Sequence, residues 1–306
     1  MRISIIVCTY NRCEILKYCL DSLEKQYVEK AQYEVIVVDN NSTDNTKEVV
    51  EEYCRKNSNF KYVFESNQGL SHARNRGAKE AKADWVGYVD DDGKVRENYI
   101  EQALFTIENF DFDCFGGKVV NWFKYGRPRW YNEIYDAEKE KYAEVCEYDG
   151  FISGGISFYK KDIIVINGGF PGHLGMNGRK LGYGEETYLQ ILIKDNGKIG
   201  FNPKIILEHL VPEHKMSVLW QLKRRFFDGE ADGLISSDDY MGFSERIKCI
   251  FKVSINTAKV LYLNFKRFFL NKDYYYQNFM FDSFSEFLFT IGRLKSKKFK
   301  RNGDHV

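Results

Sequence analysis

The chain has 306 residues, of which 43% are hydrophobic and 29% are charged. A chain of this length and composition forms one large or two modest folded domains, and the composition excludes a disordered protein. Its 45 basic and 44 acidic residues give a net charge of +1, so the overall charge does not indicate a nucleic-acid-binding protein. We therefore expect any charged partner to be recognised by a local cluster of residues.

The cysteines and the apolar runs indicate the compartment. The seven cysteines form no Cys-x-x-Cys pair, which is typical of a reducing compartment and not of a disulfide framework. The apolar run over 3–7 is short, so we expect a first strand there and not a signal peptide. No apolar stretch reaches the roughly 18 to 20 residues that span a bilayer. We expect a cytoplasmic protein, either free or peripheral at the cytoplasmic face of a membrane.

Strands and helices alternate along the first 110 residues. Apolar runs predict strands over 3–7, 33–38, 61–64 and 85–89. Apolar residues at helical spacing predict helices over 14–25, 45–56, 70–82 and 99–108. This alternation implies an α/β fold, with a mainly parallel sheet, right-handed crossovers and flanking helices.

Polar clusters follow the four predicted strands, at 9–12, 39–44, 67–69 and 90–92. Parallel strands end at one edge of their sheet, and ligands bind beyond that edge. The last cluster is Asp90-Asp91-Asp92, followed by Gly93. Alone it could be an Asp-rich turn, but three adjacent acids also suit a divalent cation. Its place beside the other three clusters favours the metal site.

The second half of the chain is less regular. It predicts strands over 114–120, 151–158 and 205–207 and a helix over 185–195. The glycines of the segment 151–158 indicate that the backbone there approaches another part of the protein closely. The glycine-rich segment 168–184 indicates a loop that moves or fits closely around a ligand, with a disordered insertion as the alternative. Aromatic residues over 122–131 could stack on sugar rings or pack a loop.

The composition changes from about residue 217 onward. Over 245–306, thirteen basic residues stand against five acidic ones, a net charge of +8, and apolar residues recur at helical spacing. We therefore predict a basic, aromatic-rich helical region over 216–306. Its segment 245–301 could lie on an anionic membrane surface. It could equally cover the preceding domain or form a homodimer.

Five segments together resemble glycosyltransferase family 2, the inverting nucleotide-sugar transferases of GT-A (Rossmann-like) fold. The segments are 5–12, 37–44, 67–77, 90–92 and 184–186. They occur in the family's order. The resemblance implies a GT-A catalytic domain over 1–215, with a nucleotide-binding half over 1–110 and an acceptor-side half over 111–215. The helical region over 216–306 lies outside it.

The resemblance also implies roles for single residues. Asp90, Asp92 and His209 would hold Mn²⁺ or Mg²⁺, which stabilises a diphosphate leaving group. A structural histidine is the alternative for His209 and for His214, a weaker candidate. Asp39 is placed like the family's base-recognition carboxylate, which implies a uracil base and hence a UDP-sugar donor. The other donor-binding candidates are Thr9, Tyr10, Asn11, Arg12, Asn67, Arg74, Asp90 and Asp91.

Inversion requires a base that takes the proton of the acceptor hydroxyl. The pair Glu185-Glu186 resembles the family's Glu-Asp motif, whose second acid usually serves as that base. Glu186 is therefore the candidate base and Glu185 the next one, although Glu in place of Asp lengthens the arm by one methylene. Two acids that merely favour a helix N-terminus are the alternative.

The predicted activity is metal-dependent transfer of a sugar from a UDP-sugar to a glycan or lipid-linked acceptor, in surface polysaccharide or glycoconjugate biosynthesis. One alternative is a sugar-phosphate nucleotidyltransferase, which should carry a glycine-rich phosphate loop after the first strand; residues 8–12 contain no glycine. The other is a non-catalytic nucleotide-sugar-binding protein. The intact acids at 90–92 and 185–186 argue against it.

Overall fold

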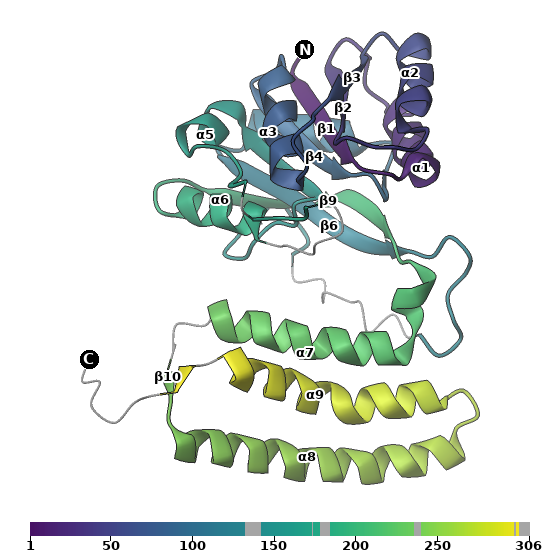
Figure 1. The fold of residues 1–306 in the computed structure, drawn as a ribbon, viewed down its shortest axis with the longest axis vertical. Coiled ribbons are helices and arrows are strands. Elements are labelled where there is room, and N and C mark those ends of the chain that lie inside the picture. The colour runs from purple at the N-terminus through teal and green to yellow at the C-terminus, as the bar shows by residue number, and fades with distance from the viewer. Residues whose placement is uncertain (132–141, 173, 178–183, 236–239, 297, 300–306) are drawn as a thin grey trace. The chain divides into compact units, whose positions relative to one another are not determined.

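A computed structural model describes residues 1–131, 142–172, 174–177, 184–235, 240–296 and 298–299 (Figure 1). The described residues form two compact units. The first unit draws on 1–122 and 138–210, and the second on 123–137 and 211–306. The predicted division at residue 215 into a catalytic domain and a helical region stays a prediction.

Four parallel strands form one half of the central sheet of the first unit. They lie in the order β3-β2-β1-β4 and comprise β1 (Ile3–Thr9), β2 (Tyr33–Asp39), β3 (Phe60–Phe64) and β4 (Trp85–Asp90). Every residue of β2 is buried, as expected of a parallel strand covered on both faces. The register places Thr9 opposite Asp39 and Cys8 opposite Asp90. The ends of these strands are therefore level, which brings the polar clusters to one edge.

Beyond β4 the sheet is mixed. The further strands are β5 (Gly93–Val95), β6 (Cys114–Trp122), β7 (Cys146–Glu147), β8 (Ile156–Lys160) and β9 (Ile199–Leu210). β8 is antiparallel to β4 and to β6, β9 is parallel to β6, and both β5 and β7 are antiparallel to β9. The α/β class is confirmed. Parallel pairing joins β3, β2, β1 and β4, and also β6 and β9, while the other pairs are antiparallel.

Helices cover the sheet (Figure 1). They are α1 (Cys13–Glu24), α2 (Thr46–Lys56), α3 (Leu70–Glu80), α4 (Tyr99–Asn109), α5 (Lys161–Ile166) and α6 (Glu185–Lys194). Between the layers, the buried rings of Phe115 and Phe158 stack with centroids 4.7 Å apart. Such a pair stabilises a core by about 0.5–1.5 kcal/mol beyond its buried area. Gly87 leaves room for this stack, because a Cβ there would lie 2.6 Å from the ring of Phe158.

Part of the glycine-rich segment is attached to the start of α3. Leu70 N–H donates to the carbonyl of Met176, and Ser71 Oγ donates to the carbonyl of Leu174. The Asn75 amide both donates to the Phe170 carbonyl and accepts from the Phe170 N–H. Residues 173 and 178–183 lie outside the described residues. The expected movement of this loop stays a prediction.

The second unit contains three long helices, with α9 lying between α7 and α8 (Figure 1). Its elements are η2 (Glu213–Met216), α7 (Val218–Ile235), β10 (Tyr240–Met241), α8 (Phe243–Leu270), α9 (Tyr276–Ser296) and β11 (Lys298–Phe299). The predicted helical C-terminal region is thus confirmed. Trp130 and Tyr131 are buried in the core of this unit. These two aromatic side chains therefore have a packing role. None of the described helices combines the length and the apolar character that a bilayer crossing requires.

The backbones of α7 and α9 touch at glycines. A Cβ on Gly229 would lie 2.0 Å from the carbonyl oxygen of Phe289, and one on Gly292 would lie 1.9 Å from the carbonyl oxygen of Phe226. Any side chain at either position would force the helices apart. Glycine is therefore required for this crossing.

Candidate functional site

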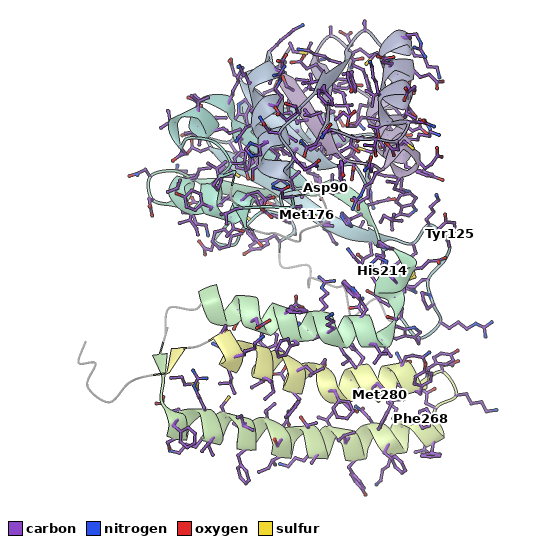
Figure 2. The ribbon with its side chains drawn as sticks, in the orientation of Figure 1. Asp90, Tyr125, Met176, His214, Phe268 and Met280 are labelled. Atoms are coloured by element: carbon purple, nitrogen blue, oxygen red, sulfur yellow. The ribbon has the colours of Figure 1, made fainter. Side chains whose placement is uncertain are left out.

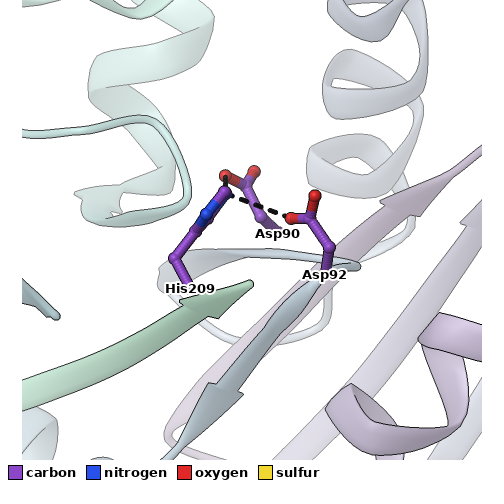
Figure 3. Close-up of side chains that lie close together, drawn as sticks. All are labelled: Asp90, Asp92 and His209. Atoms are coloured by element: carbon purple, nitrogen blue, oxygen red, sulfur yellow. Dashed lines mark ion pairs between the residues drawn. The ribbon is translucent and has the colours of Figure 1, made fainter. Parts of the chain in front are cut away.

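Asp90, Asp92 and His209 form a cluster at the edge where the parallel strands end (Figure 3). His209 Nε2 lies 3.1 Å from an Asp92 carboxylate oxygen and 3.8 Å from an Asp90 oxygen. One ligand atom from each residue lies within 4.8 Å of the other two. Two carboxylates and an imidazole at this spacing suit Mn²⁺, and the carboxylates suit Mg²⁺. The structure thus brings together the three predicted metal ligands.

Sheet register places His209 beside the two aspartates. The chain leaves β4 at Asp90 and re-enters the sheet at Gly93, which pairs with His209 across the antiparallel β5 and β9. The Leu210 N–H donates to the Asp92 carbonyl at 2.9 Å, which fixes the turn against β9. Gly93 is needed here, because a Cβ would lie 2.5 Å from the Leu207 side chain. The ligand set therefore rests on strand pairing and not on a free loop.

Asp91 faces a different partner. Its carboxylate is buried and lies 2.9 Å from Arg12 Nη1, which is also 2.9 Å from Asp92 Oδ2. Arg12 thus joins the polar cluster after β1 to the one after β4. Of the three consecutive aspartates, Asp90 and Asp92 lie beside His209, and Asp91 anchors the guanidinium.

The pKa values of two aspartates are raised. Burial raises the pKa of Asp90, Asp92 raises it further, and Arg74 and His209 oppose the shift. Burial also raises the pKa of Asp91 to about 6, against the opposing charge of Arg12. Crowded carboxylates favour their neutral form unless a cation is close. A divalent cation among Asp90, Asp92 and His209 would relieve this repulsion, so the residues present fit such an ion.

The two glutamates that open α6 differ in environment. Glu185 is 4% exposed at its side chain and accepts a 2.7 Å hydrogen bond from Arg74 Nη1. The side chain of Glu186 is 25% exposed and lies 3.9 Å from the same nitrogen. Both Glu185 Oε2 and Glu186 Oε2 are buried and have no hydrogen-bond donor among the described residues. The two glutamates therefore differ in their exposure and in their distance from Arg74: Glu185 forms the buried ion pair, and Glu186 has the more exposed carboxylate.

Arg74 is enclosed on several sides. Its guanidinium carbon lies 5.8 Å from the centre of the Tyr88 ring and 5.4 Å from that of Phe170. A Cβ on Gly154 would lie 2.5 Å from Arg74 Nη2, and one on Gly155 would lie 2.1 Å from an Asp90 oxygen. This pair of glycines forms the close backbone approach ahead of β8. The predicted donor contact of Arg74 stays a prediction, and the structure adds its ion pair with Glu185.

Asp39 ends β2 with both carboxylate oxygens in use. One accepts from the Ser42 N–H and the other from the Tyr62 hydroxyl, each at 2.9 Å. Asp39 also lines a pocket of about 360 Å³, together with Ser42, Thr43, Asp44, Lys47, Glu48, Tyr62 and Phe64. A base whose N–H donates a hydrogen bond to the Asp39 carboxylate would share that carboxylate with the Tyr62 hydroxyl. The sequence did not single out Tyr62 as a site residue, because Tyr62 lies in the middle of β3 and not in a polar cluster after a strand.

The remaining donor-binding candidates line the same edge. Asn11 has a positive φ of 53° and joins two loops: its N–H donates to Ser42 Oγ, and its side-chain oxygen accepts from the Thr43 N–H. Thr9 is buried at the end of β1, and Tyr10, partly exposed, follows it. Asn67 is exposed. Three of these candidates lie at the end of β1 or directly after it, and Asn67 lies in the loop after β3.

Asn40 was also missed by sequence reasoning. Its buried amide donates to the Asn67 carbonyl at 2.7 Å and accepts from the Gly69 N–H at 2.7 Å. It thereby fixes the loop that leads into α3. The sequence signal that could have identified Asn40 is its position directly after Asp39. His214, in contrast, lies in η2 of the second unit, with its ring against Trp220.

The profile of Glycosyl transferase family 2 matches residues 4–165. The chain belongs to this family. Among curated relatives, it is 29% identical to glycosyltransferase AglE of Haloferax volcanii over 174 residues, which cover 56% of this chain and 57% of AglE. It is 24% identical to a glucosyl-dolichyl phosphate glucuronosyltransferase of the same organism, over 83% of this chain and 85% of the relative. The chain thus spans little more than half of AglE and most of the second relative.

Solved structures show the GT-A fold. The chain resembles Staphylococcus aureus TarS 1–349 in complex with UDP, with a TM-score of 0.55 and 22% identity over 78% of this chain and 67% of that one. It also resembles the mannosyltransferase PcManGT from Pyrobaculum calidifontis in complex with GDP-Man and Mn²⁺. That TM-score is 0.55, with 20% identity over 77% of this chain and 65% of PcManGT. The predicted fold and family are therefore confirmed.

Proposed function

We propose that this protein is a metal-dependent, inverting glycosyltransferase that moves a sugar from a UDP-sugar to a glycan or lipid-linked acceptor. The observation that carries the proposal is the cluster of Asp90, Asp92 and His209, on the same sheet edge as Asp39. The Asp39 carboxylate would recognise the base, and the cluster would hold a divalent cation for the diphosphate. The pathway is synthesis of a surface polysaccharide or another glycoconjugate.

The cluster would hold Mn²⁺ or Mg²⁺, through Asp90, Asp92 and His209. Such an ion, when bound, stabilises negative charge on the diphosphate leaving group. The spacing of these three ligands in this chain fits a cation. The Mn²⁺ in the solved complex of PcManGT supports the proposal of a metal ion.

The protein's own residues then act on the acceptor. The Glu186 carboxylate, the more exposed of the two, would accept a hydrogen bond from the acceptor hydroxyl and take its proton as the hydroxyl oxygen attacks the anomeric carbon. Arg74 and Glu185 position the start of α6 through their buried pair, and so orient Glu186. Arg12 lies 2.9 Å from Asp92 and can contact a phosphate oxygen with a charge-assisted hydrogen bond.

The donor is assigned through its base. Asp39 offers a carboxylate to a uracil N–H, and the solved TarS complexes contain UDP and UDP-GlcNAc. The acceptor class is supported by a relative whose name gives a glucosyl-dolichyl phosphate, which is a lipid-linked sugar. Residues 111–215 would form the acceptor side.

A screen of nucleotide-sugars tests the proposal. The purified chain is incubated with UDP- and GDP-sugars in the presence of Mn²⁺, Mg²⁺ or a chelator, and the released nucleotide is measured. We expect slow, metal-dependent release of UDP from one of the UDP-sugars. Release of GDP alone would overturn the uracil assignment. Release that persists with the chelator would overturn the metal assignment.

A further inference from the structure

The second unit has an apolar surface that the proposed chemistry does not use. It runs along α8, on the side turned away from α9, and we call it the outer face of α8 (Figure 2). Its side chains are 43–70% exposed and comprise Phe243, Ile247, Phe251, Ile255, Tyr262, Phe265 and Phe269. Their spacing of three, four or seven residues places them on one side of the helix.

The opposite side of α8 already has a partner. Val253 and Asn264 are buried, and the Asn264 amide donates to Ser283 Oγ of α9 at 3.0 Å. Among the described residues, α8 therefore has one face packed against α9 and one apolar face that stays exposed.

Charge identifies the partner. Four exposed lysines form a row along one border of the outer face, at Lys248, Lys252, Lys259 and Lys266. The only acidic residue within 243–270 is Glu245, whose carboxylate accepts a hydrogen bond from the Gly242 N–H at the helix start. An apolar face bordered by lysines is typical of a helix that lies in the surface of an anionic bilayer.

A second copy of this chain fits the same face less well. Two α8 helices packed face to face and antiparallel would bring the two lysine rows to the same border without carboxylates to neutralise them. Lipid phosphates supply that missing negative charge. We propose that the outer face of α8 binds an anionic membrane surface, with the aromatic side chains among the acyl chains and the lysines at the headgroups.

The test is flotation of the full-length chain with vesicles. Vesicles of phosphatidylcholine alone are compared with vesicles of phosphatidylcholine and phosphatidylglycerol in equal parts. We expect the protein to float with the anionic vesicles, and to be released from them at about 0.5 M salt, where charges are screened within a few ångströms. Equal binding to both vesicle types, or binding to neither, would overturn the proposal.

Two variants separate the apolar and the charged contributions. Replacing Phe251, Phe265 and Phe269 by Asn should lower vesicle affinity by more than about tenfold, because each exposed ring contributes apolar area. The matched control replaces Phe105, Val165 and Ile166 of the first unit by Asn; these are 45–76% exposed and should not affect binding. Circular dichroism checks that each variant is folded.

The lysine variant replaces Lys248, Lys252, Lys259 and Lys266 by Gln. It should bind anionic vesicles at least about tenfold more weakly, since each lysine near such a surface adds to the attraction. The control removes the same charge from the first unit, at the exposed residues Lys25, Lys56, Lys79 and Lys82. Equal weakening in both variants would overturn the assignment to α8.

Sedimentation velocity distinguishes membrane binding from self-association. A chain that is monomeric without lipid supports the proposal. A dimer that dissociates on replacement of Phe251 would instead assign the face to a second copy. Metal-dependent UDP binding is measured on the same variants and should be unchanged, so the membrane proposal and the proposed chemistry can fail independently.

Discussion

Glu185 and Glu186 are adjacent in the chain and have different functions in the proposed mechanism. Glu185 is buried against Arg74, and Glu186 is more exposed. We expect Glu186→Gln to reduce transfer by about 10²–10⁴-fold, because the amide cannot take a proton. UDP affinity, measured by calorimetry, should stay at the wild-type value.

Glu186→Asp is the matched control for this prediction. It keeps the carboxylate and shortens the arm to the length that the family's motif usually has, so a measurable part of the transfer should remain. Wild-type turnover by Glu186→Gln would mean that the base is another residue.

The buried pair of Arg74 and Glu185 predicts a pH-dependent stability. Burial raises the pKa of Glu185 above its ordinary value, and the charge of Arg74 offsets this only in part. In Arg74→Met the lowering charge is gone, so the pKa of the carboxyl in the folded protein should rise further above that of the unfolded chain. Folded Arg74→Met should therefore be more stable in acid and lose stability as pH rises through the raised pKa. The expected loss above that pKa is about 3–5 kcal/mol.

Thermal unfolding between pH 5 and pH 8 measures this loss. The double variant Arg74→Met with Glu185→Gln removes the Glu185 carboxyl, so its stability should lack the part of the added pH dependence that comes from Glu185. If Arg74→Met shows the wild-type pH profile, Glu185 is not held as a charged group by Arg74.

At the scale of elements, the crossing of α7 and α9 depends on glycine. Gly229→Ala should destabilise the second unit by about 1–3 kcal/mol, because the added Cβ overlaps the backbone of α9. Gly242→Ala is the matched control: its φ is −66° and the nearest atom to an added Cβ is 3.4 Å away. Chemical unfolding followed by circular dichroism compares the two, and equal midpoints would refute the packing argument.

The sequence predicted the elements of the parallel half closely, because buried strands, helical spacing and polar strand ends are local signals. It could not predict the antiparallel pairing of β5 with β9, which brings His209 to Gly93 across 116 positions of the chain. It also gave no signal for the pairing of Arg74 with Glu185. Both depend on contacts between distant segments, and no periodicity in the chain encodes them.

At the scale of the whole molecule, the metal should stabilise the fold, because its ligands come from the end of β4, the turn before β5 and β9. An ion at 100 times its dissociation constant adds about 2.7 kcal/mol to the stability of the state that binds it. We expect Mn²⁺ to raise the melting temperature of the wild-type chain. Asp92→Asn should abolish the rise.

The control for the metal experiment is Asp84→Asn. Asp84 is an exposed carboxylate just before β4, at the opposite end of that strand from the cluster. The Mn²⁺-dependent rise should persist in this variant. A rise that survives in Asp92→Asn would place the ion elsewhere.

The glycine contacts between α7 and α9 also determine how α8 transmits a force. α8 is joined to the chain on both sides, by α7 before it and by α9 after it, and those two helices are locked backbone to backbone. Since α8 packs against α9, we expect a pull on the outer face of α8 to pass through α9 to α7. The three helices of the second unit should therefore respond to a mechanical load as one cooperative unit.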